Sequence, residues 1–166
     1  MTQFHSPVLL NEAINGLKIS PKGVYIDATF GGGGHSKAIL TMLNKEGRLL
    51  SFDQDEDTYE NKINDSRFEF ISANFNHLSQ YLKYYGIKSV DGVLADFGVS
   101  SHHFDLASRG FSIRKNGRLD MRMNQNQKLD AHYIINNYEE EDLNNLFFNY
   151  GEVRNSKKNL KTNFKF

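Results

Sequence analysis

The sequence predicts an α/β fold built on an open sheet of parallel strands. An apolar run, residues 24–27, ends in a carboxylate and is followed at once by four glycines and an amphipathic segment, residues 36–43. This order is typical of a strand, a tight turn and a helix. The next apolar run delivers Asp53, 20 positions beyond Gly33. An acid about 20 residues past the glycines holds the ribose hydroxyls of an adenosine in such folds.

The glycine run indicates which kind of adenosine-containing ligand to expect. Counted from Gly31, the G-x-G-x-x-G pattern of dinucleotide-binding proteins has Ser36 in place of its third glycine. A phosphate-binding loop would continue with Lys-Ser or Lys-Thr, whereas His35 and Ser36 follow here. Both departures favour an adenosine without a pyrophosphate, and we expect S-adenosylmethionine. A glycine turn that binds no ligand is the alternative for the loop taken alone.

Composition bounds the class of protein. The chain has 166 residues, enough for one domain with a substantial core. Lys and Arg balance Asp and Glu at 20 each, so no overall basic field indicates nucleic acid. Cysteine is absent, which excludes disulfides and thiolate metal sites. No signal peptide or apolar run of about 20 residues is visible, so we expect a cytoplasmic protein without membrane contact.

Hydrophobic periodicity and turn residues place the remaining elements. Apolar residues at helical spacing follow Pro7, which suits a first helical turn. Helices are expected over residues 4–19, 36–44, 77–85 and 130–150, and strands over residues 24–27, 48–52, 67–72 and 90–97.

Four side chains at expected strand ends form the candidate site: Asp27, Asp53, Phe75 and Asp96. Ligands of open α/β sheets bind outside the carboxyl ends of the strands. We therefore expect Asp53 to face the ligand and Asp96 to bind rather than to cap the next segment. For Phe75 two roles stay open, covering the adenine ring or packing under the following helix.

Two patterns resemble metal sites but fail on spacing. Residues 53–57 open like a calcium loop, yet position six is Thr58 and position twelve is Asn64. Asp55 and its acidic neighbours instead suit the start of a helix. The adjacent pair His102 and His103 lacks the i, i+4 spacing of a zinc pair. We expect no metal.

The character of the chain changes near residue 108. Residues 109–123 carry five cationic side chains and one acid, with Phe111 and two methionines between them. Such a segment can follow a phosphate backbone while its apolar groups touch bases, and a solvated, salt-bridged loop is the alternative. Beyond it, an apolar stripe is expected to be core, formed by Leu143, Leu146, Phe147 and Tyr150.

Six motifs occur in order over residues 5 to about 158: HSPVLLNE (5–12), YIDATFGGGGHS (25–36), DFGVSS (96–101), RGFS (109–112), LDMRM (119–123) and YGEVRN (150–155). Together they resemble the MraW family of bacterial ribosomal RNA cytosine-N4 methyltransferases. Their number, length and order make the match specific.

The resemblance implies a Rossmann-like class I S-adenosylmethionine methyltransferase sheet. Residues 1–105 would hold its first four strands in the order 3-2-1-4, and residues 106–166 the start of a helical inserted domain. It also implies S-adenosylmethionine contacts at Gly33, Gly34, His35, Asp53, Phe75 and Asp96. A further contact, a glutamine in the family, falls on His103, whose imidazole can still donate or accept a hydrogen bond.

The substrate implied is a cytidine in the decoding region of small-subunit (16S) ribosomal RNA. It would be methylated on its exocyclic N4, with Asp96 as the catalytic acceptor of a hydrogen bond from the amine. The target base must leave its stack to enter such a site, and residues 109–122 are the expected RNA-facing element.

The family continues well beyond residue 166, so a truncated or frameshifted reading frame is one hypothesis. The strand around Val93 would then be an unpaired edge that invites association, including a homodimer. The alternative function is a non-catalytic fragment that at most binds S-adenosylmethionine or a partner. A methyltransferase acting on another amine or on DNA, and lastly a dinucleotide oxidoreductase, are further alternatives.

Overall fold

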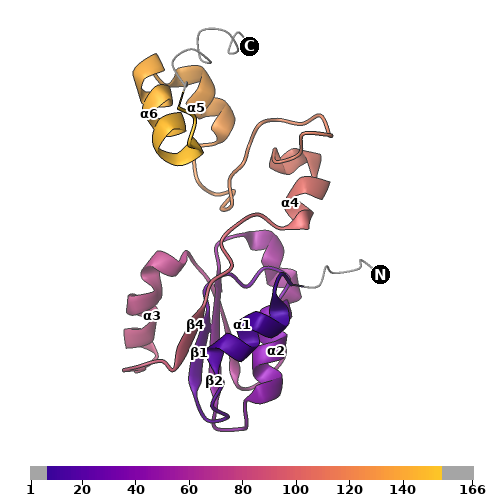
Figure 1. Ribbon diagram of the computed structural model, residues 1–166, viewed down its shortest axis with the longest axis vertical. Coiled ribbons are helices and arrows are strands. Elements are labelled where there is room, and N and C mark those ends of the chain that lie inside the picture. Colours follow the sequence, from indigo (N-terminus) through magenta and orange to yellow (C-terminus); the bar gives the residue numbers. More distant parts are fainter. Residues whose placement is uncertain (1–6, 155–166) are drawn as a thin grey trace. The chain divides into compact units, whose positions relative to one another are not determined.

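The computed structural model describes residues 7–154 of the chain. The chain divides into two compact units (Figure 1). The first comprises the chain up to Ser101 together with Met123–Gln125, and the second comprises His102–Arg122 together with the chain from Asn126 onward. The first unit holds the sheet and the second is mainly helical. The domain boundary expected after residue 105 stays a prediction.

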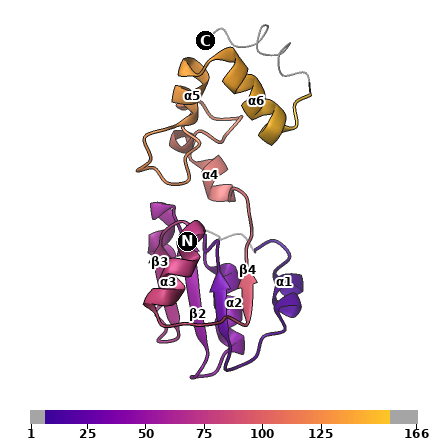
Figure 2. The same ribbon diagram turned by 90° about the vertical axis from the view of Figure 1, so that its left-hand side faces the viewer.

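Strands and helices alternate along the first unit (Figure 2). This order confirms the α/β fold class expected from the glycine loop and the apolar runs around it. The elements are α1 (Leu10–Leu17), β1 (Val24–Asp27), α2 (Gly34–Met42), β2 (Arg48–Asp53), the 3₁₀ helix η1 (Glu56–Asn61), β3 (Phe68–Ser72), the 3₁₀ helix η2 (Phe75–His77), α3 (Leu78–Tyr84) and β4 (Gly92–Leu94).

The four strands form one parallel sheet in the order β3-β2-β1-β4. This is the expected strand order. In the register, Asp27 lies opposite Ser51 and Leu94, and Asp53 lies opposite Ser72. Because all the strands run the same way, their carboxyl ends meet at one edge of the sheet. That edge is where ligands of such sheets bind.

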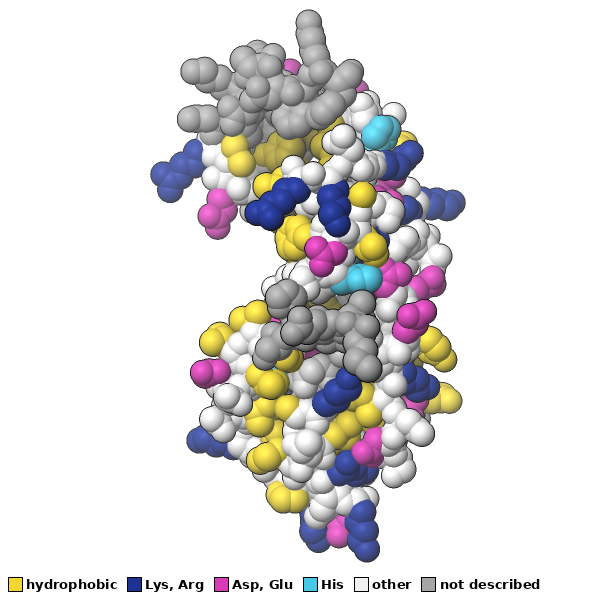
Figure 3. Space-filling model, turned by 90° about the vertical axis from the view of Figure 1, so that its right-hand side faces the viewer, with side chains coloured by type: hydrophobic (Ala, Val, Ile, Leu, Met, Phe, Trp, Pro, Cys, Tyr) yellow, Lys and Arg dark blue, Asp and Glu magenta, His cyan; other side chains and the backbone are white. Residues whose placement is uncertain are grey.

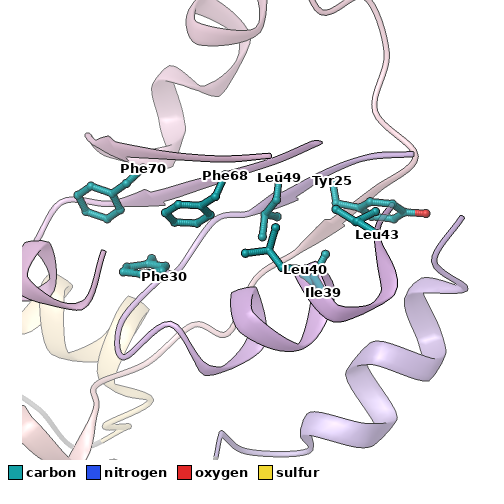
Figure 4. Packing of buried hydrophobic residues seen from close by; sticks show 8 residues of the cluster. All are labelled: Tyr25, Phe30, Ile39, Leu40, Leu43, Leu49, Phe68 and Phe70. Carbon is teal, nitrogen blue, oxygen red and sulfur yellow. The ribbon is translucent and has the colours of Figure 1, made fainter. Parts of the chain in front are cut away.

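Both faces of the sheet are covered by helices, α2 on one face and α3 on the other (Figures 1 and 2). Successive strand residues point to opposite faces, so Tyr25 belongs to one apolar cluster and Ile26 to the other. In the first cluster, Phe30 and the apolar side of α2 meet the strand residues (Figure 4). In the second, Leu50 and Phe52 meet α3 through residues such as Tyr81. Burying each such side chain contributes about 1.5–3 kcal/mol.

The second unit contains three helices and a short 3₁₀ turn within its described residues. A single helix was expected over residues 130–150, but extended backbone at Tyr138 and Glu139 separates two helices. Tyr150 is 86% exposed, so the expectation that it belongs to the core is wrong, whereas Leu143 is buried. The elements are α4 (Ser101–Asp105), η3 (Ala107–Arg109), α5 (Ala131–Asn137) and α6 (Glu140–Gly151).

Two expected elements are shorter than the sequence indicated. The first helix begins at Leu10 because Leu9 has φ 51°, a left-handed conformation that a helix cannot continue through. Residues 4–6 of that expectation lie outside the described residues. The strand expected over 90–97 is reduced to Gly92–Leu94, and the backbone N–H of Asp96 bonds to a side chain of the β1 end instead of a strand.

A bidentate ion pair at the start of β3 makes the stability of the first unit depend on pH. The Arg67 guanidinium donates to both Asp65 oxygens, over 2.9 and 2.6 Å. These bonds, aided by the Arg67 amide, lower the pKa of Asp65 to about 2. Because the pKa is lower in the folded chain than in the unfolded one, the stabilisation is complete above about pH 4 and is lost as the pH falls toward 2.

We therefore expect Asp65→Asn to lower the free energy of unfolding at pH 7 and to lower it less at about pH 3, measured by urea denaturation. The matched control is Glu46→Gln, which removes the carboxylate of an exposed pair with Lys22 and should change little at either pH. A deficit for Asp65→Asn that is as large at pH 3 as at pH 7 would contradict the assignment.

Candidate functional site

The conformation of the glycine loop between β1 and α2 requires glycine at three positions, for two different reasons. Gly31 and Gly33 have φ of 51° and 74°, where side chains are strained. Gly34 is required for another reason, since a Cβ there would lie 2.2 Å from Cγ of Pro7. At Gly31 nothing lies within 4 Å of the position that a Cβ would take, so a ligand can approach the backbone closely at that point of the loop.

Asp53, at the end of β2, is bound to this loop. One carboxylate oxygen accepts the Gly31 N–H over 2.8 Å, and the other accepts the Asp55 N–H over 3.0 Å. The carbonyl of Gly31 in turn accepts from the Asn61 amide over 3.0 Å. An ionised carboxylate can accept about four hydrogen bonds. A carboxylate at this position is the group that holds ribose hydroxyls in folds of this kind.

Beneath the loop, a buried hydrogen-bond network joins β1, α2 and β2. The Ser36 hydroxyl donates to Asp27 over 2.7 Å and lies 2.7 Å from the Ser51 hydroxyl, and all three side chains are fully buried. The second Asp27 oxygen accepts the Thr29 N–H over 3.1 Å. Burial raises the pKa of Asp27, while the bonds from Ser36 and Thr29 oppose the rise. Asp27 therefore supports the loop from below and does not face a ligand.

The end of β4 is tied to the end of β1. The backbone N–H of Asp96 donates to the Thr29 hydroxyl over 2.8 Å, and the Asp96 side chain is exposed. One residue further, the ring of Phe97 lies 5.4 Å from the ring of Phe75, which follows β3. Phe75 keeps 39% of its surface exposed. The edge of the sheet thus presents a carboxylate and an aromatic pair beyond the loop.

All of the predicted contact residues except His103 lie in the first unit. Gly33, Gly34 and Asp53 lie on or against the loop, and the His35 ring is buried with Nε2 3.2 Å from the Val8 carbonyl. His103 belongs to the second unit, where its ring is buried 5.2 Å from the ring of Phe111. The roles of all the predicted contact residues in binding stay predictions.

Sequence reasoning missed the residues that hold the site in place. Thr29, Ser36, Ser51 and Asn61 each make a hydrogen bond to the loop, to a predicted site residue, or to the network beneath them. Ser51 carried a usable signal, because it is a hydroxyl inside an otherwise apolar strand. A buried hydroxyl needs a hydrogen-bond partner, and Ser36, two residues after the glycine run, is the hydroxyl that supplies it.

Within residues 7–154 no group of three or more His, Cys, Asp or Glu side chains is arranged to hold a metal ion. Over the same part of the chain, no helix has the length and apolar character that crossing a membrane requires.

A parallel β3-β2-β1-β4 sheet, a glycine loop after the first strand and an acid after the second define a Rossmann-like α/β fold of the methyltransferase type. The family model described as the MraW methylase family matches residues 2–162. The chain belongs to that family.

Curated proteins with similar sequences support membership of this family. The chain is 55% identical over 162 residues to a protein of Christiangramia forsetii named ribosomal RNA small subunit methyltransferase H, covering 98% of this chain and 54% of that protein. Proteins of the same name from Phocaeicola vulgatus and Porphyromonas gingivalis are 56% and 49% identical, over 93% of this chain and 51% and 50% of theirs. The chain spans about half the length of the curated relatives it matches.

The bond from Asp96 to Thr29 can be tested directly. We expect Thr29→Val, which keeps the side-chain shape but removes the acceptor, to speed amide hydrogen exchange at Asp96 about five- to tenfold, equivalent to about 1 kcal/mol. Thr29→Ser, which keeps the hydroxyl, should leave that rate close to wild type, measured by NMR. The Ala28 amide, which donates to the Leu94 carbonyl, serves as an internal control. Equal protection of Asp96 in the Val and Ser variants would show that the hydroxyl does not hold this strand end.

Proposed function

We propose that the carboxyl edge of this sheet binds S-adenosylmethionine, and that the chain contributes this site to an enzyme that methylates N4 of a cytidine in the decoding region of small-subunit ribosomal RNA. The observation that carries the proposal is the bond between Asp53 and Gly31, which joins an acid suited to a ribose to a loop of bare backbone. Family membership and the relatives' printed name support the same reading.

The residues present fit this cofactor. The Asp53 carboxylate is the type of group that holds ribose hydroxyls, and nothing lies within 4 Å of the Cβ position of Gly31, so a ligand can approach the main chain there. Gly33 and Gly34 are proposed contacts through their backbone. Phe75 offers a half-exposed ring to the adenine. His35, Asp96 and His103 are the remaining proposed contacts. When bound, the sulfonium cofactor supplies an electrophilic methyl group.

Cytosine N4 is a weak nucleophile because its lone pair is conjugated with the ring. A protein group can help by holding N4 in line and by accepting a hydrogen bond from the amine as positive charge develops on it. Asp96 is suited to this role, since its side chain is exposed at the end of β4 while its backbone is fixed by Thr29. We assign the catalytic acceptor role to Asp96.

A second candidate function is a non-catalytic, cofactor-binding fragment. The observation that favours it is the coverage of only about half of each relative's length. The two candidates share the cofactor site and differ in methyl transfer, so binding and transfer must be measured separately.

For binding, we expect the chain to take up S-adenosylmethionine and not NAD in isothermal titration. Asp53→Asn should weaken binding about 10- to 100-fold, because hydrogen bonds to a charged group contribute about 1.5–3 kcal/mol. The control is Glu60→Gln, an exposed acid of η1 that should leave the affinity unchanged. Wild-type affinity in a folded Asp53→Asn protein would remove Asp53 from the site.

For transfer, we expect Asp96→Ala to lower methylation of small ribosomal subunits at least 100-fold, the usual contribution of a positioned proton acceptor. Some cofactor affinity should persist, since Asp53 and the glycines are untouched. The assay follows labelled methyl groups from S-adenosylmethionine into ribosomal RNA. Unchanged turnover would exclude Asp96 from the mechanism, and cofactor binding without transfer by the wild-type chain would favour the fragment.

A further inference from the structure

The loop of residues 110–118 presents a fully exposed isoleucine. Ile113 is 100% exposed, more than any other large hydrophobic side chain within residues 7–154. Its neighbours Arg114 and Lys115 are exposed as well. From Leu106 to Leu119 the sequence has four cations and no acid. An apolar side chain at the tip of a positively charged loop is costly to leave in water, so a bound partner that covers it would recover that cost.

Two close-packed glycines and one backbone hydrogen bond hold the loop of residues 110–118 in place. A Cβ on Gly110 would lie 2.3 Å from the amide nitrogen of Asp120, and a Cβ on Gly117 would lie 2.1 Å from the carbonyl oxygen of Ala107. The backbone of each glycine is therefore pressed against the segment beside it. The loop is also closed at its base, where the Met121 N–H donates to the Arg109 carbonyl over 2.9 Å.

The structure also separates the five cations of this region into internal and outward-facing ones. Arg122 forms a bidentate pair with Asp120, over 2.6 and 2.9 Å, and Arg109 is 2% exposed and donates to the Arg122 carbonyl. These two arginines stabilise the unit itself. Arg118 pairs with Asp130 over 2.8 Å but leaves 61% of its side chain exposed.

Arg114 and Lys115 thus supply exposed positive charge beside Ile113 in the sequence, and Arg118 adds a guanidinium that is exposed although it pairs with Asp130. Lys115 donates to the Asp105 carbonyl, a neutral partner, over 2.5 Å. Figure 3 shows Lys and Arg side chains next to exposed hydrophobic ones on the face of the second unit that it presents.

We propose that this tip, Ile113 with Arg114, Lys115 and Arg118, is a contact surface for structured RNA. The cations lie on phosphates, and Ile113 packs against a base at a step where the stack is already open. The inference rests on the proposed function, because it takes the substrate to be RNA. Charge complementarity favours RNA over a protein partner, and an apolar side chain flanked by cations is how proteins contact opened base steps.

The two parts of the tip have separable signatures. Each phosphate contact releases counterions, so removing it flattens the dependence of log affinity on log salt by about 0.7–0.9. An apolar contact with a base contributes affinity without releasing counterions. The cations therefore control the salt slope, while Ile113 controls affinity at constant slope.

The experiment uses the full chain and a fluorescein-labelled RNA hairpin whose loop is unpaired, followed by anisotropy over a series of KCl concentrations. We expect Arg114→Gln/Lys115→Gln to flatten the slope by about 1.5. Ile113→Ser should weaken binding about 5- to 30-fold with the slope unchanged. The matched controls are Lys83→Gln/Lys88→Gln for the charge and Phe148→Ser for the exposed apolar group, both of which should match wild type.

Two results would show that the tip does not contact RNA: a salt slope in the double variant equal to that of wild type, or an affinity of Ile113→Ser equal to that of wild type. Either result would leave the proposed function standing. Absence of RNA binding by the wild-type chain would overturn both the tip and RNA as the substrate. The cofactor titration of Asp53→Asn is independent of either result.

Discussion

The candidate site depends on one hydrogen bond, from the Gly31 N–H to the Asp53 carboxylate over 2.8 Å. It connects the loop after β1 to the end of β2, and it can form only because the parallel register brings those ends to the same edge. Without it, the loop and the acid would be two separate features of neighbouring strands. With it, the loop backbone and a carboxylate lie together at the carboxyl edge of the sheet, which suits the adenosine that we propose as the ligand.

Polar as well as apolar interactions hold the glycine loop and the start of α2 in place. A fully buried carboxylate at Asp27 is unfavourable unless its oxygens are satisfied, and Ser36 and Thr29 donate to them. The network fixes the start of α2 and the turn after β1 together. The second unit is organised differently. Among its described residues only Leu143 is a buried hydrophobic side chain. Hydrogen bonds from Arg122 lower the pKa of Asp120, and the Tyr133 backbone N–H, together with Arg118, lowers the pKa of Asp130.

Most of the sheet could be predicted from the sequence, because each strand is an apolar run that ends in a polar or turn residue. Asp53 was identifiable by its distance from Gly33 alone. Local patterns do not determine burial, however, so Asp27 and Asp53 looked alike although one lies under the loop and the other against it. For the same reason Arg122 could not be told from Arg114, since only the fold pairs the first with Asp120 and leaves the second exposed.

The most direct test of the central claim follows backbone amides by NMR during titration with S-adenosylhomocysteine, the product form of the proposed cofactor. The account predicts shifts at Gly31, Gly33 and Asp53, at the carboxyl edge, and none at Gly23 and Gly47, which precede β1 and β2 at the opposite edge. Shifts centred on Gly23 and Gly47, or saturation of the protein without a response at Gly31, would contradict it.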